Sequence, residues 1–213
     1  MTDVAVVDYG VGNLLSVSRA LAHCGANVTV TSDPASILTA SRVVLPGVGA
    51  FADGMAALQA NGLDAVVRQV ANQGTPLLGI CLGMQLLFSE SEEFGATVGL
   101  GVIPGRVVQI PTQTLAGGLQ KIPHIGWNEL VLPDPHKPWQ GGLLAAIAPG
   151  EAVYFVHSFM AVPTSLPHRL ADCAYGGVAI SAAVQHGNVV GCQFHPEKSG
   201  DVGLRILSNF LSG

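Results

Sequence analysis

The chain has 213 residues, of which 49% are hydrophobic and 11% charged, and a formal net charge of -5. Its mean hydropathy is +0.47. The length suits one domain with a large apolar interior. The negative net charge gives no reason to expect a nucleic acid or an anionic membrane as a partner. No apolar run approaches the roughly 18 residues that span a bilayer.

The N-terminal residues show no basic segment followed by an apolar stretch, so we expect no signal peptide. The four cysteines lack metal-binding spacing. We therefore expect a cytoplasmic protein with reduced thiols, no metal and no cofactor. The cysteines are Cys24, Cys81, Cys173 and Cys192.

The first part of the chain alternates predicted strands with predicted helices. A continuous apolar run at residues 4–8 is typical of a strand covered on both faces, and further strands are predicted at residues 28–31, 42–45 and 76–81. Helical patterns cover residues 14–23, 54–61 and 63–73, and a short helix begins at Asp33-Pro34. This rhythm predicts a parallel α/β sheet with right-handed crossovers. Ligands bind at the carboxyl ends of such strands.

After Glu93 the chain becomes richer in glycine, proline and β-forming residues. Strands are predicted at 105–110, 128–132 and 152–156, and a hairpin joins 180–186 to 189–194. Residues 111–118 and 133–142 are predicted loops, and 203–211 a final helix. The expected fold is α/β: a flavodoxin-like, mostly parallel sheet flanked by helices, with additional antiparallel strands in the second half. No linker interrupts it, so we expect a single domain over residues 1–213.

Residues 76–85 form the stretch around which the chain is organised. An apolar run leads into Gly79-Ile80-Cys81-Leu82-Gly83, and a helix-like segment over 84–88 follows at once. A strand, a sharp turn that carries one residue and a helix behind it are the signature of a nucleophile elbow. The helix N-terminus would lie beneath the sulfur and favour the thiolate. A buried core cysteine between two packing glycines is the alternative.

A nucleophilic Cys81 needs a base, and the end of the last predicted strand offers one. His195 directly follows that strand and precedes Pro196 and Glu197. At the sheet edge His195 can face the elbow, while Glu197 can reach the other ring nitrogen and fix the tautomer. A surface turn is the alternative for these residues alone. His124 and His157 lack metal-ligand spacing, so we expect structural or substrate-side roles for them.

These motifs together resemble class I (triad) glutamine amidotransferases, through Gly79–Gln85 and Phe194–Glu197. Further stretches, in order along essentially the whole chain, narrow the resemblance to the glutaminase subunits of imidazole glycerol phosphate synthases. These stretches are Asp8–Leu14, Leu45–Phe51, His124–Asn128, Tyr154–Ser158 and His195–Ser199.

The resemblance implies hydrolysis of L-glutamine to glutamate and ammonia through a cysteine thioester, with Cys81, His195 and Glu197 as the catalytic triad. The tetrahedral oxyanion needs preorganised N–H donors. The glycines at 47 and 49 would let their loop hold two backbone states, one of them blocking that hole. The oxyanion-hole residues are Val48, Gly49 and Leu82, and the substrate-binding residues are Gly49, Gln85, His157, Ser158 and Phe159.

Two of these assignments depend on the resemblance in different ways. Gln85 lies one helical turn beyond Cys81, and without the family it would be an ordinary polar helix position. Many members of the family carry a tyrosine where this chain has Phe159. A backbone contact at that position would survive the change, whereas a hydroxyl contact would not.

Free ammonia is mostly protonated at neutral pH, so a glutaminase that feeds a synthase gains from direct transfer. The resemblance implies a heterodimer with a cyclase of (β/α)8 type, which uses the ammonia to form imidazole glycerol phosphate and AICAR in histidine biosynthesis. It places the docking face at Asn13, Trp127, Tyr154 and Lys198. By their residue types alone, Trp127 and Tyr154 fit interface anchors and core aromatics equally.

Two other classes of function are the alternatives. The first is a different triad glutaminase, such as the pyridoxal phosphate synthase subunit, or a γ-glutamyl hydrolase. The stretches at 124–128 and 154–158 argue against both. The second is a non-enzymatic, redox-sensing flavodoxin-like protein, which would not need His195 and Glu197 after the last strand.

Overall fold

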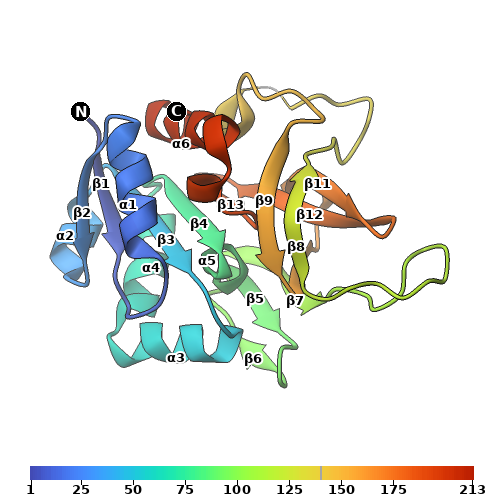
Figure 1. Cartoon of the computed structure of the whole chain (residues 1–213). Helices are drawn as coiled ribbons and strands as arrows, with labels where there is room; N and C mark the ends of the chain where they lie inside the picture. Colours follow the sequence, from blue (N-terminus) through green and yellow to red (C-terminus); the bar gives the residue numbers. More distant parts are fainter. Residues whose placement is uncertain (140) are drawn as a thin grey trace.

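The computed structural model describes residues 1–139 and 141–213, and a seven-stranded sheet forms its centre (Figure 1). The strands lie in the order β11-β12-β13-β4-β3-β1-β2. From β13 to β2 they run parallel, and β11 and β12 add an antiparallel edge. The predicted mostly parallel α/β fold is confirmed. The strands are β1 (Asp3–Val7), β2 (Asn27–Thr31), β3 (Arg42–Gly47), β4 (Leu77–Cys81), β11 (Arg169–Tyr175), β12 (Val178–His186) and β13 (Val189–Cys192).

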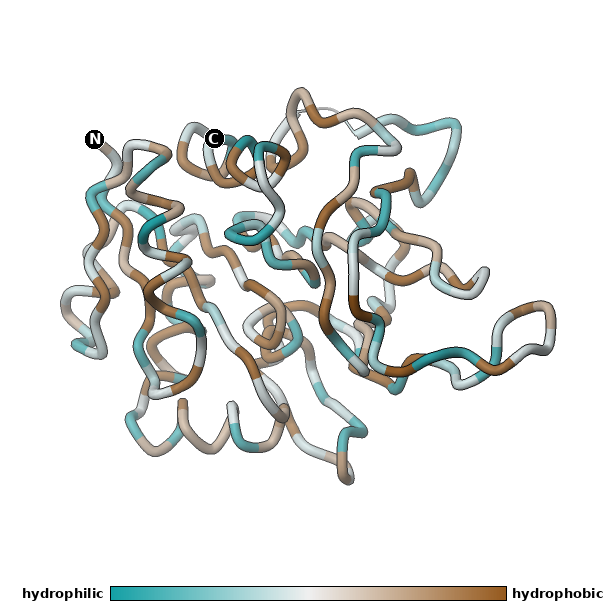
Figure 2. Tube along the Cα trace, in the orientation of Figure 1, coloured by the Kyte–Doolittle hydropathy of each residue, from teal (hydrophilic) through white to brown (hydrophobic). Residues whose placement is uncertain are grey.

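Helices cover both faces of this sheet because successive strand residues point to opposite sides. Along β1, Val4 and Val6 face one layer of helices, whereas Ala5 and Val7 face the other. All four are buried, and Figure 2 shows the apolar strands running through the middle of the molecule. The first layer holds α1 (Leu14–His23) and α6 (Gly200–Ser212); the second holds α2 (Pro34–Thr39), α3 (Phe51–Ala60) and α4 (Leu63–Asn72).

The second half of the chain adds two smaller sheets beside the central one. One sheet has the order β10-β7-β5-β6, and the other is the antiparallel pair β8-β9 (Figure 1). Their strands are β5 (Phe88–Ser91), β6 (Thr97–Val98), β7 (Ile103–Gln109), β8 (His124–Glu129), β9 (Ala152–His157) and β10 (Phe159–Pro163). The short helices are α5 (Leu82–Leu86), η1 (Gly142–Leu144), η2 (Leu166–His168) and η3 (Pro196–Lys198).

Several predicted elements are wrong in their bounds, and strand pairing explains two of them. The helix expected over 84–88 is α5, which begins at Leu82 and ends at Leu86. Phe88 instead begins β5, where it pairs with Ile103 and is completely buried. The strand expected over 128–132 is β8, which ends at Glu129 because its partner β9 begins at Ala152 in that register.

Long-range contacts explain the other differences. Helix α3 begins at Phe51, not at residue 54, because the Glu93 carboxylate accepts the Phe51 N–H at 2.7 Å. Strands β5, β6, β10 and β11 were not predicted. Residues 111–118 form a loop, whereas η1 begins at the last residue of the loop expected over 133–142, and Gln140 lies outside the described residues. Across the described ranges, no helix combines the length and apolarity of a membrane span.

The parallel strands bring four loops to one edge of the sheet. The loops that follow β1, β3, β4 and β13 all leave from the carboxyl ends of their strands. Cys81 ends β4, Gly47 ends β3, and Gln193 directly follows β13. Sequence segments more than 100 residues apart therefore meet at this edge, as expected for an open α/β sheet.

The fold depends on a close approach between α5 and β3. A Cβ atom on Gly83 would overlap the backbone carbonyl of Leu45. Since neither backbone can move without disturbing β3, we expect Gly83→Ala to lower the free energy of unfolding by about 3 kcal/mol, measured by urea denaturation. The control is Gly118→Ala, since a Cβ there lies 3.5 Å from its nearest neighbour, an ordinary contact. Equal stability of the two variants would contradict this packing argument.

Candidate active site

Cys81 occupies a strained turn between β4 and α5. Its φ of 54° lies in the left-handed region, which L-residues other than Asn and Asp rarely adopt. The neighbouring glycines permit this turn, because a Cβ on Gly79 would lie 2.7 Å from the Cα of Met84 and one on Gly83 would overlap Leu45. The predicted strand-turn-helix geometry is therefore present, although α5 has only five residues.

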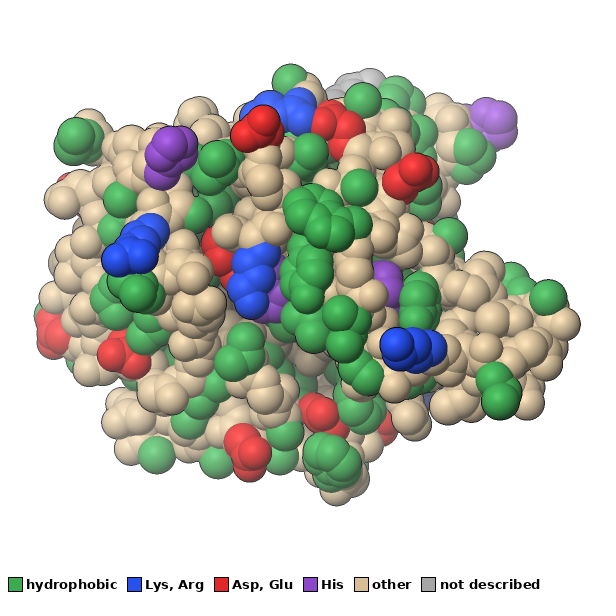
Figure 3. Space-filling model, viewed as in Figure 1, with side chains coloured by type: hydrophobic (Ala, Val, Ile, Leu, Met, Phe, Trp, Pro, Cys, Tyr) green, Lys and Arg blue, Asp and Glu red, His purple; other side chains and the backbone are tan. Residues whose placement is uncertain are grey.

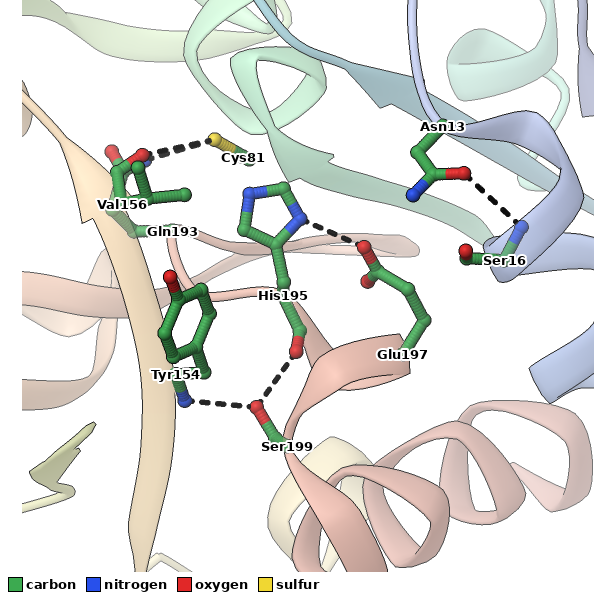
Figure 4. Close-up of polar contacts among 9 residues, drawn as sticks. All are labelled: Asn13, Ser16, Cys81, Tyr154, Val156, Gln193, His195, Glu197 and Ser199. Atoms are coloured by element: carbon green, nitrogen blue, oxygen red, sulfur yellow. Dashed lines mark hydrogen bonds and ion pairs between the residues drawn. The ribbon is translucent and has the colours of Figure 1, made fainter. Parts of the chain in front are cut away.

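His195 lies beside the sulfur and Glu197 lies on the far side of the ring, on the loop and short helix after β13 (Figure 4). His195 Nδ1 lies 2.8 Å from Glu197 Oε1, and both side chains are buried. This contact fixes the tautomer, since Nδ1 donates to the carboxylate. His195 Nε2 and Glu197 Oε2 are buried and have no hydrogen-bond partner within the described part of the chain. Nε2 is thus the nitrogen available to the sulfur or to a bound molecule.

The electrostatics of His195 favour the charged ring. Burial alone would lower the pKa of His195, but the neighbouring Cys81 sulfur and the Glu197 carboxylate raise it to about 9. A protonated imidazole next to a sulfur stabilises the thiolate, which is the nucleophilic form of cysteine.

The glycine-rich loop after β3 is anchored from beneath. The Tyr9 hydroxyl donates to the Pro46 carbonyl at 2.8 Å, and burial raises the pKa of Tyr9, so the hydroxyl remains a donor. Gly49 has a φ of 106°, which a residue with a side chain would adopt only under strain. Val48 and Gly49 both line the cavity above Cys81.

A cavity of about 390 Å³ opens over the sulfur and collects most of the predicted site residues. Glu197 lies behind His195 and is not part of the wall. The predicted residues that line the cavity are Val48, Gly49, Cys81, Leu82, Gln85, His157, Ser158, Phe159 and His195. Glu93, Pro123 and Val156 complete the lining and were not predicted.

Two hydrogen bonds, one to a backbone carbonyl and one to a side chain, fix the amide of Gln85. Its Nε2 donates to the Phe159 carbonyl at 3.1 Å and to Gln193 Oε1 at 2.9 Å. The Phe159 contact is made by the backbone, so it does not need a tyrosine hydroxyl. Both amide hydrogens are thus in use, and Gln85 Oε1 has no partner among the described residues.

His124 and His157, for which we expect structural or substrate-side roles, form a buried pair. His157 Nδ1 donates to the Phe159 carbonyl at 2.8 Å, and its Nε2 lies 2.9 Å from His124 Nδ1. Burial lowers the pKa of His124 to about 4 and that of His157 to about 3, so both rings are neutral at neutral pH. Across residues 1–139 and 141–213 no group of three or more His, Cys, Asp and Glu could hold a metal ion.

The four residues expected at a docking face lie outside the cavity wall. Asn13 caps α1 by accepting the Ser16 N–H at 3.3 Å. Trp127 and Tyr154 are cross-strand neighbours on β8 and β9, with ring centroids 6.1 Å apart. Trp127 is 58% exposed, Tyr154 is half-buried, and Lys198 is exposed on η3.

Three residues near the sulfur were missed by the sequence analysis: Tyr9, Glu93 and Gln193. Tyr9 stands inside the stretch Asp8–Leu14, and Gln193 directly precedes Phe194–Glu197, but neither residue type indicates a role there. Glu93 follows a strand that was itself not predicted, and its carboxylate reaches the cavity because it caps α3. Only the tertiary contact identifies it.

Comparisons with known proteins place the chain in a family. The sequence profile of "Glutamine amidotransferase class-I" matches residues 5–212. The chain therefore belongs to the class-I glutamine amidotransferase family. It is 53% identical over 211 residues to Imidazole glycerol phosphate synthase subunit HisH 1 of Legionella pneumophila (strain Lens), covering 99% of each chain. It is 49% identical over 210 residues to subunit HisH of Moorella thermoacetica, covering 99% of this chain and 94% of the relative. Within the class it groups with these HisH subunits.

Solved structures support the fold. A structure described as "Crystal structure of glutamine amidotransferase" matches with a TM-score of 0.72 at 17% identity, covering 98% of this chain and 99% of that one. The "Structure of PurLQS from Thermotoga maritima" matches with a TM-score of 0.71 at 20% identity, covering 99% and 98%. At such identities the likeness concerns the fold alone.

The raised pKa of His195 gives a pH prediction. Glu197 helps to raise that pKa above 6.5, so Glu197→Gln should shift the titration of the His195 ring from near pH 9 to lower pH, as followed by NMR of labelled histidine. The stabilisation by the charged ring is complete below about pH 6.5 and is lost as pH rises towards 9. The free energy of unfolding of the parent should fall across that window more than that of the variant. Glu90→Gln, at an exposed residue, is the control. An unchanged midpoint in Glu197→Gln would contradict the pairing.

Proposed function

We propose that this chain is the glutaminase subunit of an imidazole glycerol phosphate synthase. It hydrolyses L-glutamine to glutamate and ammonia and delivers the ammonia to a partner cyclase for histidine biosynthesis. The observation that carries the proposal is the strained Cys81 beside the His195–Glu197 pair at the wall of one cavity. Identity of about half with the HisH subunits over the full length supports it, and the proposal assigns residues 1–213 to one glutaminase domain.

The reaction proceeds through a thioester. The Cys81 thiolate attacks the side-chain carbonyl carbon of glutamine, and the resulting oxyanion takes hydrogen bonds from backbone N–H groups of Leu82 and of the loop at Val48 and Gly49. His195 Nε2 gives its proton to the departing nitrogen, so ammonia leaves. His195 then takes a proton from water, which attacks the thioester and releases glutamate.

Two acceptor groups at the cavity suit the α-ammonium end of glutamine. Glu93 brings a carboxylate to the lining, and Gln85 Oε1 offers an acceptor that no group of the described chain uses. An α-ammonium group has three donors and a positive charge, which matches these two acceptors. Ser158 supplies a hydroxyl to the opposite wall.

An exposed apolar surface beside the cavity provides the docking face. Ile125 and Trp127 are 55% and 58% exposed on β8, and their cross-strand partners are Val156 and Tyr154 on β9. Figure 3 shows hydrophobic side chains gathered over these two strands, with a basic side chain next to them. Aromatic anchors of this kind dominate protein interfaces. The proposed partner is a cyclase of (β/α)8 type in a heterodimer, with Asn13, Trp127, Tyr154 and Lys198 at the contact.

The backbone connects this face to the catalytic histidine. Ser199 Oγ donates to the His195 carbonyl at 2.7 Å and accepts the Tyr154 N–H at 2.9 Å (Figure 4). The Lys198 N–H donates to the same carbonyl at 3.0 Å. A partner that presses on Tyr154 or binds Lys198 therefore acts on groups that hold His195, and docking can shift the populations of the adjacent oxyanion loop.

The first test of the function replaces the nucleophile. Cys81→Ala should abolish glutamate release, with and without the cyclase, because no other group can form the thioester. The readout is glutamate formation, with thermal unfolding and cyclase binding as checks of the fold. Cys173→Ala is the matched control: this thiol is buried, and burial raises its pKa to about 12. Normal glutamine hydrolysis by Cys81→Ala would refute the proposed function.

The second test concerns activation by the partner. The isolated chain should be a poor glutaminase, stimulated by saturating cyclase with its nucleotide substrate. Lys198→Ala should reduce that stimulation about tenfold and the basal rate much less, since about 1.4 kcal/mol of interface energy corresponds to a factor of ten. Lys137→Ala, at another exposed lysine, should leave both rates unchanged. Equal basal and stimulated rates in the parent would remove the case for partner gating.

A further inference from the structure

Gln193 places a buried amide between two residues of the proposed site. It directly follows β13 and precedes Phe194 and His195. Its side chain is completely shielded from solvent, and it is not part of the cavity wall. A glutamine in such a place loses hydration at both ends of its amide, so its partners in the protein decide its role.

The hydrogen bonds settle which way this amide points. The Phe159 carbonyl can only accept, so the Gln85 group that contacts it must be the NH₂. The second hydrogen of that NH₂ goes to Gln193 at 2.9 Å, which requires Gln193 Oε1 there. Gln193 Nε2 is therefore directed at the Cys81 sulfur, 3.8 Å away (Figure 4). This series of hydrogen bonds begins at the Phe159 carbonyl, passes through the two amides and ends at the Cys81 sulfur.

The Cys81 sulfur contacts one group that can accept a hydrogen bond from it and one group that can donate a hydrogen bond to it. As a thiol it can donate to the Val156 carbonyl, 4.0 Å away. As a thiolate it can only accept, and Gln193 Nε2 is in place as the donor. A hydrogen bond to an ionised acceptor is about twice as strong as one between neutral groups, so the Gln193 contact favours the thiolate.

We propose that Gln193 is a positioning residue that acts through two others: one end of its amide holds the Gln85 amide, and the other holds and polarises the Cys81 sulfur. The inference rests on the proposed function, because it assigns Gln193 a role in that same site. It also makes a separate statement about thiol chemistry, which can be measured without glutamine.

Two substitutions separate the two ends of the amide. Gln193→Met has a similar size but neither donor nor acceptor, so it should free the Gln85 amide and remove the donor from the sulfur. Gln193→Glu keeps an oxygen for Gln85 but places a second acceptor, charged when ionised, next to the sulfur. Gln185→Met, at a half-buried residue on β12 whose amide contacts the Gly187 carbonyl, is the matched control.

The readouts are iodoacetamide alkylation of Cys81 as a function of pH and the steady-state kinetics of glutamine hydrolysis with cyclase. Both Gln193 variants should shift the alkylation profile upward by about one pH unit, which is about a tenfold slower reaction below the midpoint. Gln193→Met should raise KM about tenfold and lower kcat. Gln193→Glu should lower kcat while KM stays within about twofold of the parent.

Other titrating groups face the sulfur and must be separated from this effect. They are His195 from the loop after β13 and Tyr9 from the loop after β1, and His157 and Glu93 line the same cavity. The parent protein isolates the Gln193 contribution: the side-chain amide signals of Gln193 in a ¹⁵N spectrum should shift with the same midpoint as Cys81 alkylation. This measurement needs no variant, so it decides the question even where a substitution disturbs folding.

Each outcome supports or overturns the proposal. Alkylation profiles that coincide with the parent, in variants that merely melt at lower temperature, would show Gln193 to be a packing residue only. Amide signals that do not respond to Cys81 ionisation would overturn the proposal as well. A failure of the proposed function looks different, because the parent would then alkylate at Cys81 as described and still not hydrolyse glutamine.

Discussion

The site depends on the contact between Gly83 of α5 and the Leu45 carbonyl of β3. This approach, which a single methyl group would prevent, keeps the short helix against the neighbouring strand and leaves Cys81 at a φ of 54°. A residue in that region costs of order 1–3 kcal/mol, and the surrounding packing offsets it. The sulfur then leaves the sheet edge towards the cavity rather than into the core, and Gln85 follows one turn later on the same helix.

Polar groups around the cavity divide into those with partners and those without. Gln193, His157 and Ser199 all use their side chains on other parts of the protein. His195 Nε2 and Glu197 Oε2 are buried without partners among the described residues. Since buried polar groups are almost always paired, an unpaired nitrogen next to the nucleophile fits a group whose partner is the reacting molecule.

The sequence predicts the central sheet well because its signals are local. Apolar runs predicted β1, β3 and β4, and α1 was predicted at residues 14–23, where the structure has it. The same locality explains the failures. β8 is determined by its register with β9, the start of α3 by a carboxylate 42 residues away, and Phe88 by its pairing with Ile103. None of these partners can be recognised from neighbouring residues.

The residues of the candidate site also divide into those that local sequence predicts and those that only long-range contacts identify. Cys81, His195 and Glu197 stand in short motifs with a chemical meaning, so they were found from sequence, and the structure brings them together at one edge. Tyr9 meets the site at Pro46, and Gln193 meets it at Cys81 and Gln85, on elements far from both residues in the sequence. Their residue types suggest nothing in isolation, because a buried tyrosine or glutamine serves many purposes.

The β8-β9 pair determines how a partner can influence chemistry it does not touch. It is a separate two-stranded sheet, and its alternating side chains give it an outer face with Trp127 and an inner face with the buried His124 and His157. The inner face joins the site through the Phe159 carbonyl, and the Tyr154 N–H joins it through Ser199. The ribbon also meets the site directly, because the His195 N–H donates to the Tyr154 carbonyl at 2.9 Å. These hydrogen bonds couple the position of the ribbon to the position of the site. Under the proposed function, displacement of its outer face by a docked cyclase would change the positions of the Gln85 amide and the His195 backbone together.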